Sequence, residues 1–250
     1  MIGVVALVAL SQTVSAPPAA MHADPFYAKC VFTRGLPIMA SKNVSDAALV
    51  QAAGLAAHML QGVRADAIVA MHENHIRIAI IGAHEQTTDI PEYRDLNTRF
   101  PGTDWNKRTR GVGATSEIPV ISGAEENLLA LPGDRYKGEC IFIHEFGHTI
   151  ADMGVASVDK SFLPSLRKAY RQAVAEGLWK KTYASSNESE YWAEGVQDYF
   201  DCNAHVTPPN GIHNEIWTRR QLAAYDPRLY TLLRRVFGEY PWRWSPPTSS

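Results

Sequence analysis

The chain has 250 residues, of which 46% are hydrophobic and 20% are charged, and its formal net charge is −2. This composition is ordinary for a soluble globular protein and predicts a sizeable core in one large domain or two small ones. This net charge and a pI near 6.5 give no electrostatic sign of nucleic-acid binding, so we expect no nucleic-acid partner. Nothing in the sequence indicates an oligomeric state.

The chain begins with an apolar segment, residues 1–10, that is too short to span a bilayer. Small residues follow, and Val14-Ser15-Ala16 resembles a cleavage site, so we interpret residues 1–16 as a secretory signal and expect a secreted, extracellular protein. The alternative is the flexible N-terminus of a cytosolic protein, because no basic residue precedes the apolar stretch. No later stretch predicts a transmembrane helix, so no membrane partner is expected.

The first half of the chain predicts a small sheet with one helix. Residues 27–41 are typical of two short strands around a glycine and a proline, and residues 45–61 have the three- and four-residue apolar spacing of a helix. Residues 75–81 alternate and then become wholly apolar, which predicts a central strand. Residues 84–109 are polar and contain proline, which indicates a loop with a short helix.

Two short segments, residues 110–114 and 118–122, are then typical of edge strands. A substrate in extended conformation can bind to a protein by adding a strand to such an edge. Gly111, Val112 and Gly113 would leave backbone accessible for this purpose, and we take them as candidate substrate-binding residues. A glycine-rich hairpin is the alternative.

The most informative stretch is His144-Glu145-Phe146-Gly147-His148, within a helix predicted from about residue 136 to Met153 and ended by Gly154. Positions four apart lie on one helical face, so the two imidazoles can converge on one Zn²⁺ ion. Glu145 can then hold a water molecule as a catalytic base, which is the arrangement of a zinc metallopeptidase. An ordinary helix with hydrogen-bonded core histidines is the alternative, and a third ligand decides between them.

The third ligand is expected on a second helix. Ala151 and Gly154 stand where a metzincin has its glycine and third histidine, so that class is excluded. Glu190 and Glu194 are four apart between aromatic residues that predict burial. One carboxylate can complete the His₂Glu ligand set of catalytic zinc, and the other can accept the free ring N–H of a ligating histidine. We take Glu190 as the ligand and Glu194 as the acceptor, to His144. A solvated acidic face is the alternative.

Together, HEFGH and the later pattern of Tyr183, Asn187 and Glu190-Tyr-Trp-Ala-Glu194 resemble the catalytic domain of anthrax lethal factor and the Pro-Pro endopeptidases. These are zinc metalloendopeptidases of the glutamate-zincin type, and the resemblance covers residues 135–205. It implies the same metal ligands and Glu145 as general base. It further implies that Tyr183 hydrogen-bonds the oxyanion of the reaction, whereas the residue alone is equally typical of a packed aromatic. Residues 17–134 carry no motif of this family.

Helices in the second half follow from apolar spacing and from capping residues. Thr218 and Gln221 form a capping box, and Asp226-Pro227 is an N-cap followed by proline at the first helical position. The helices are predicted at about residues 162–177, 188–202 and 227–237, with a further one beginning at the capping box of Thr218. Trp242 and Trp244 are expected to dock onto the body.

Three cysteines, Cys30, Cys140 and Cys202, form an odd set, which in a secreted protein indicates one disulfide and one buried or free thiol. If the two site helices run antiparallel, Cys140 and Cys202 can meet. Buried free thiols are the alternative.

We therefore expect an α+β, zincin-like metallopeptidase domain at residues 17–244, with a small mixed sheet, a helical half that carries the zinc site, and a disordered tail at 245–250. The expected function is a secreted endopeptidase that binds one Zn²⁺ ion and cleaves a protein or peptide substrate. A catalytically silent zincin used as a binding module, and a zinc amidase for non-peptide substrates, are the alternatives.

Overall fold

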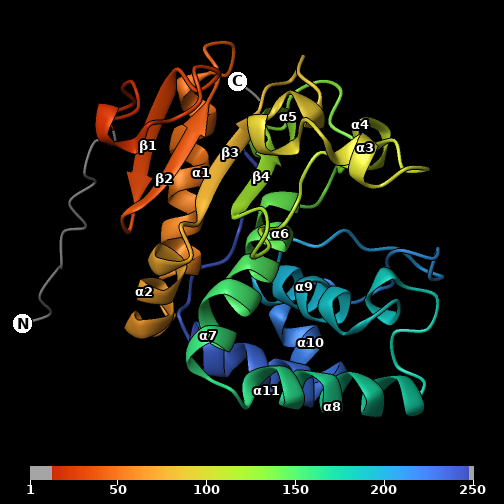
Figure 1. The fold of residues 1–250 in the computed structure, drawn as a ribbon. Coiled ribbons are helices and arrows are strands. Elements are labelled where there is room, and N and C mark those ends of the chain that lie inside the picture. Colours follow the sequence, from red (N-terminus) through yellow and green to blue (C-terminus); the bar gives the residue numbers. More distant parts are fainter. Residues whose placement is uncertain (1–12, 248–250) are drawn as a thin grey trace, which may run out of the picture.

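The computed structural model describes residues 13–247. Residues 1–12 of the predicted signal and residues 248–250 of the predicted tail lie outside the described residues. The fold is a mixed α+β arrangement in which a small sheet with its covering helices occupies one half and helices fill the other (Figure 1). No helix among the described residues is long and apolar enough to cross a membrane.

A four-stranded sheet of order β1-β2-β3-β4 organises the first half. β1 and β2 are antiparallel and form a hairpin around Arg34 and Gly35, whose φ angles are 49° and 83°. β2–β3 and β3–β4 are parallel, so the sheet is mixed as predicted. The strands are β1 (Lys29–Thr33), β2 (Leu36–Ala40), β3 (Arg77–Ile81) and β4 (Val120–Ala124).

The central strand β3 is buried on both faces, as its apolar run predicts. Because side chains alternate along a strand, Ile78 and Ile80 belong to the large core formed with the helices, whereas Ala79 and Ile81 belong to a smaller core on the opposite face. Tyr93 of the 84–109 segment fills that smaller core, and its hydroxyl donates a 2.7 Å hydrogen bond to Val120 O.

One helix, at residues 65–73, was not predicted. The helices connect the sheet to the second half (Figure 1). They are α1 (Asp46–Met59), α2 (Ala65–Glu73), α3 (Leu96–Arg99), α4 (Trp105–Arg108), α5 (Glu125–Leu128), α6 (Ile141–Thr149), α7 (Ala156–Val158), α8 (Phe162–Ala175), α9 (Glu188–Tyr199), α10 (Arg219–Tyr225) and α11 (Pro227–Phe237). A π-helical turn, η4 (Ile150–Val155), joins α6 to α7, and short 3₁₀ turns are η1 (Ala19–Met21), η2 (Thr87–Asp89), η3 (Pro91–Tyr93) and η5 (Tyr183–Ser185).

The helix that carries HEFGH differs from its predicted extent at both ends. It begins at Ile141 rather than near residue 136, because Cys140 is extended and donates its backbone N–H to Cys202 O at 3.0 Å. It also does not stop at Gly154. The backbone continues through η4 into α7, and a Cβ at Gly154 would lie 3.2 Å from Met71 Cγ of α2. Gly154 therefore permits close helix packing and does not end the helix.

The capping signals of the second half are confirmed. Thr218 and Gln221 form the predicted capping box of α10, and Asp226 caps α11 with Pro227 at its first turn. Trp242 docks as predicted, with its ring centroid 4.4 Å from that of His58 in α1. These contacts fasten the C-terminal segment to the first half of the chain.

The three cysteines are buried free thiols. Cys140 and Cys202 do meet, as the antiparallel arrangement predicts, but through the backbone hydrogen bond given above and without a disulfide. Burial raises the pKa of the Cys140 thiol to about 12, which keeps it protonated at neutral pH.

Candidate metal centre

The site lies where α6 packs between β4 and α9 (Figure 1). Gly147 allows this close approach, because a Cβ at that position would lie 3.1 Å from both methyl carbons of Val196 in α9. Trp192 of α9 donates its indole N–H to Gly147 O at 2.9 Å, which fixes the two helices against each other. His144 and His148 thereby face the beginning of α9.

The N-terminus of α9 is built to present Glu190. The side chain of Asn187 is the N-cap, and its Oδ1 accepts hydrogen bonds from the backbone N–H groups of Ser189 and Glu190 at 2.9 and 3.0 Å. Such a cap satisfies amide groups that would otherwise lack partners in the first helical turn. Glu190 therefore projects from an ordered first turn.

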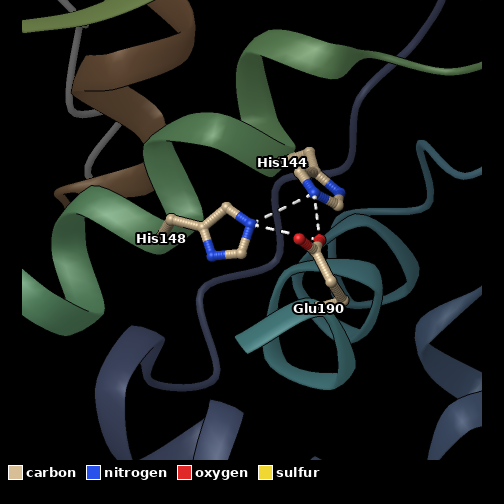
Figure 2. A group of neighbouring side chains, drawn as sticks. All are labelled: His144, His148 and Glu190. Carbon is tan, nitrogen blue, oxygen red and sulfur yellow. Dashed lines mark hydrogen bonds and ion pairs between the residues drawn. The ribbon is translucent and has the colours of Figure 1, made fainter. Parts of the chain in front are cut away.

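His144, His148 and Glu190 point toward one another from the two helices (Figure 2). The Nε2 atoms of the two histidines are 3.2 Å apart, and Glu190 Oε2 lies 3.1 Å from Nε2 of His144 and 3.4 Å from Nε2 of His148. Zinc bonds to nitrogen and oxygen of about 2.0–2.1 Å place tetrahedral donors about 3.3 Å apart. The three donors thus fit one metal ion, and within residues 13–247 they are the one cluster of this kind.

The charges of the three side chains are coupled. Burial alone would lower the pKa of His144, but the carboxylates of Glu190, Glu145 and Glu194 raise it to about 10. Burial opposes ionisation of Glu190, yet the hydrogen bonds of His144 and His148 hold the pKa of that carboxyl well below its usual range. In the metal-free protein, Glu190 is therefore ionised and its charge is balanced by a proton on His144, which a bound metal ion would displace.

The other ring nitrogen of each histidine also has a neighbour. Nδ1 of His148 lies 2.9 Å from Ser189 Oγ. Nδ1 of His144 lies 2.8 Å from Gln197 Oε1 and 3.5 Å from Oε1 of Glu194, the predicted acceptor. Glu194 is thus beside His144 as predicted, but Gln197 is closer.

Glu145 and Tyr183 border the cluster. Burial raises the pKa of the Glu145 carboxyl, an effect that His144 and His148 oppose. Tyr183 lies in η5, and its ring centroid is 6.4 Å from that of His144. Burial, followed by the charge of Glu190, raises the pKa of Tyr183 to about 12, so its hydroxyl remains a proton donor at neutral pH.

The segment of Gly111, Val112 and Gly113 runs beside both the sheet and α6. The predicted edge strand is not formed here, because only Val112 of this segment forms a β-bridge, with Ser122. The N–H of Val112 donates to Ser122 Oγ at 3.1 Å, and its C=O accepts the backbone N–H of Ser122 at 2.9 Å. A Cβ at Gly113 would lie 3.1 Å from His148 Cβ. The glycines therefore allow close packing on α6, and substrate binding along this segment stays a prediction.

Gly111 offers a direct test of that packing. A Cβ there would lie 2.8 Å from Ile141 Cγ2 and 3.0 Å from Glu145 Cγ. We expect Gly111→Ala to lower the free energy of unfolding by about 1–3 kcal/mol, as overpacking typically does. Urea denaturation of both proteins measures this. The control is Gly54→Ala in α1, because a Cβ at that position meets nothing within 4 Å. Gly102→Ala would not serve, because its φ of +98° would itself strain an alanine.

A group of buried polar residues lies behind His144. It comprises Glu139, Glu194, Gln197, Asp198 and Asn203, each less than 9% exposed. Asn203 Nδ2 donates to Asp198 Oδ1 at 2.9 Å and to Glu194 Oε2 at 3.2 Å. One sequence signal points to Gln197, because positions 190, 194 and 197 follow the i, i+4, i+7 spacing of one helical face. Glu139 and Asn203 lie in loops and had no such signal.

Asp198 makes the metal-free protein sensitive to pH. Burial raises its pKa well above the ordinary value of 3.8, and its Oδ2 has no hydrogen-bond partner within residues 13–247. The folded state then binds a proton that the unfolded state releases, so stability falls as pH rises from 3.8 through the folded pKa. We expect Asp198→Asn to flatten this dependence and to raise the unfolding free energy at pH 8 by about 1–3 kcal/mol. Urea denaturation of both metal-free proteins between pH 4 and 8 measures it, and an unchanged slope would contradict it.

Neither a family model nor a curated protein sequence matches this chain. Among solved structures, the Pro-Pro endopeptidase (PPEP-2) from Paenibacillus alvei is similar, with 16% sequence identity and a TM-score of 0.46. The match covers 75% of this chain and 91% of that chain.

Proposed function

We propose that this protein is a zinc-dependent endopeptidase. The observation that supports it most is the set of three donor atoms, His144 Nε2, His148 Nε2 and Glu190 Oε2, lying 3.1–3.4 Å from one another beside Glu145. Two imidazoles and one carboxylate form the ligand set typical of catalytic rather than structural zinc, because a fourth position stays open. A secreted location remains our expectation from the apolar composition of residues 1–10.

When bound, zinc would lower the pKa of a coordinated water to about 7 and polarise the carbonyl group of a substrate. The charges of His144, His148 and Glu190 all act on the Glu145 carboxyl, so this group lies close to the three donors. We infer that this carboxylate accepts the proton of the attacking water and then passes it to the amine of the leaving peptide, as a general base and acid. The burial of Glu145 favours the protonated form that the second step requires.

Tyr183 is proposed to donate its hydroxyl proton to the oxyanion of the tetrahedral intermediate. Loss of one such donor commonly lowers kcat by about 10²–10³-fold. We expect Tyr183→Phe to reduce kcat by that factor while zinc content and KM change little, because the variant keeps the three proposed ligands, His144, His148 and Glu190. Steady-state kinetics together with metal analysis measure this. A variant with normal kcat would remove Tyr183 from the reaction.

The test of the proposed function uses the full chain freed of metal by a chelator and restored with one equivalent of Zn²⁺. Both forms are incubated with a peptide library, and products are identified by mass spectrometry. We expect internal peptide bonds to be cleaved only by the restored form. Binding of peptides without cleavage would identify a silent binding module, and cleavage of sugar or cell-wall amides alone would identify an amidase. Either result would overturn the proposal.

A further inference from the structure

The strongest unassigned feature is the hydrogen-bonded chain that leads from His144 into the protein interior. Gln197 Oε1 lies 2.8 Å from Nδ1 of His144, and Gln197 Nε2 donates to Glu139 Oε2 at 3.2 Å. Gln197 is fully buried and Glu139 is 8% exposed. Two protein segments thus converge behind this histidine: α9 supplies Gln197, and the loop before α6 supplies Glu139.

The order of donors and acceptors along these hydrogen bonds follows from the chemistry of His144 at one end and Glu139 at the other. Nε2 of His144 belongs to the metal cluster, so it must offer a lone pair and the proton must sit on Nδ1. A protonated Nδ1 needs an acceptor, which is the carbonyl oxygen of the Gln197 amide. The amide NH₂ then needs an acceptor of its own, and the Glu139 carboxylate provides it. Each donor in the chain therefore meets an acceptor.

The position of Glu139 is itself held by the surrounding structure. Asn127 Nδ2 donates to the backbone carbonyl of Glu139 at 2.9 Å, and Oδ1 of the same Asn127 accepts the backbone N–H of Ile141 at 2.9 Å. His213 Nε2 lies 3.7 Å from Glu139 Oε1. Asn127 thus anchors both Glu139 and the first turn of the helix that carries His144.

We propose that Gln197 and Glu139 are positioning residues that fix the tautomer and ring orientation of His144 for metal binding. This inference rests on the proposed metal site. Gln197 forms the direct hydrogen bond, while Glu194, 3.5 Å away, contributes negative charge beside the ring. A neutral amide at position 197 suits this interior, because Glu139, Glu194 and Asp198 already place three buried carboxyl groups there and another charge would be costly to bury.

The first experiment measures the zinc affinity of Gln197→Met by competition with a chromogenic chelator. Methionine keeps the length of the side chain but lacks the carbonyl oxygen that accepts the hydrogen bond from Nδ1–H. We expect roughly a 10- to 100-fold loss of affinity, the usual cost of removing a partner that orients a ligand. Glu194→Gln serves as the matched comparison and is expected to lose less. An unchanged affinity in Gln197→Met, or a larger loss in Glu194→Gln, would overturn the inference.

A second measurement reports on the histidine itself. In ¹⁵N-labelled protein loaded with zinc, the ring nitrogens of His144 are expected to show a protonated Nδ1 in the wild type. In Gln197→Met, the resonance of that proton should broaden or disappear through exchange. A merely structural role of Gln197 would leave the resonance unchanged.

The third experiment exchanges the two partners. Gln197→Glu alone would bring two carboxylates to the present 3.2 Å separation of Gln197 and Glu139, and we expect it to weaken zinc binding. The double variant Gln197→Glu, Glu139→Gln restores a donor opposite an acceptor and keeps an acceptor for Nδ1, so we expect it to recover most of the affinity. The exchange decides the matter if Gln197→Met fails to fold, and an unrescued double variant would contradict the proposal.

These outcomes are distinct from failure of the proposed function. If the wild-type protein bound no zinc, the metal site and everything built on it would be wrong. If the wild type bound one equivalent of zinc, and Gln197→Met bound it equally well, only the positioning role would be wrong.

Discussion

Replacing Glu145 by glutamine is expected to lower kcat for peptide cleavage by about 10²–10⁴-fold, the usual contribution of a general base. The amide has the shape of the carboxylate but cannot accept a proton from water. Because Glu145 is not one of the three clustered donors, zinc content should stay at one equivalent. The measurement compares kcat/KM on one identified peptide with the zinc content of the same sample.

Two results would contradict this expectation in different ways. A Glu145→Gln protein with normal kcat would exclude the carboxylate as the base. Loss of zinc along with activity would instead show that Glu145 takes part in metal binding. Thermal unfolding of the metal-free variant is the control, because burial of the uncharged amide should not destabilise the protein.

Replacing Glu190 by alanine is expected to have the largest effect on the metal. It removes one of three donors. Loss of a residue that only hydrogen-bonds a metal ligand lowers metal affinity by up to about 100-fold, so loss of a ligand itself should lower the affinity for zinc by more than that. The ion should then be lost on dialysis, and the stabilisation that zinc gives to the folded wild type should vanish. Metal analysis after dialysis and thermal unfolding with added zinc measure both effects.

The chain provides a matched control on the same helix turn. Glu188 lies two residues before Glu190, and its carboxylate pairs with Arg167, 3.1 Å from Nε, away from the donor cluster. Glu188→Ala removes the same charge from α9 and should leave zinc binding unchanged. Retention of zinc by Glu190→Ala, or equal losses in both variants, would show that Glu190 is not a ligand.

Elements with local signals could be predicted from the sequence. The apolar run of β3, the capping box of α10 and the Asp-Pro start of α11 each depend on residues that are adjacent in the chain. The start of α6 could not be predicted, because the acceptors of its first amide groups are distant in sequence. The N–H of Ile141 donates to Asn127 Oδ1, and the N–H of Cys140 donates to Cys202 O. Gly154 was misjudged for a similar reason, since its role is contact with α2.

In the candidate site, too, the features with local sequence signals could be predicted and those that depend on distant contacts could not. The i, i+4 spacing places His144 and His148 on one face, and the paired glutamates identify the second helix. That Glu190 meets both histidines depends on how α6 packs on α9, which Gly147 and Val196 allow by contact. The sequence predicts Glu194 as the acceptor for His144, because carboxylates commonly accept the free ring N–H of a ligating histidine, and it does not predict Gln197. Helical geometry places both residues on the same face of α9, and only the distances separate their roles.

We expect one divalent metal ion to be held jointly by α6 and α9. A crystal of the zinc-loaded protein, measured on both sides of the zinc absorption edge, tests it most directly. We expect one anomalous peak within about 2.2 Å of Nε2 of His144, Nε2 of His148 and a carboxylate oxygen of Glu190. A peak at other side chains, or one bound by the two histidines with Glu190 turned away, would contradict it.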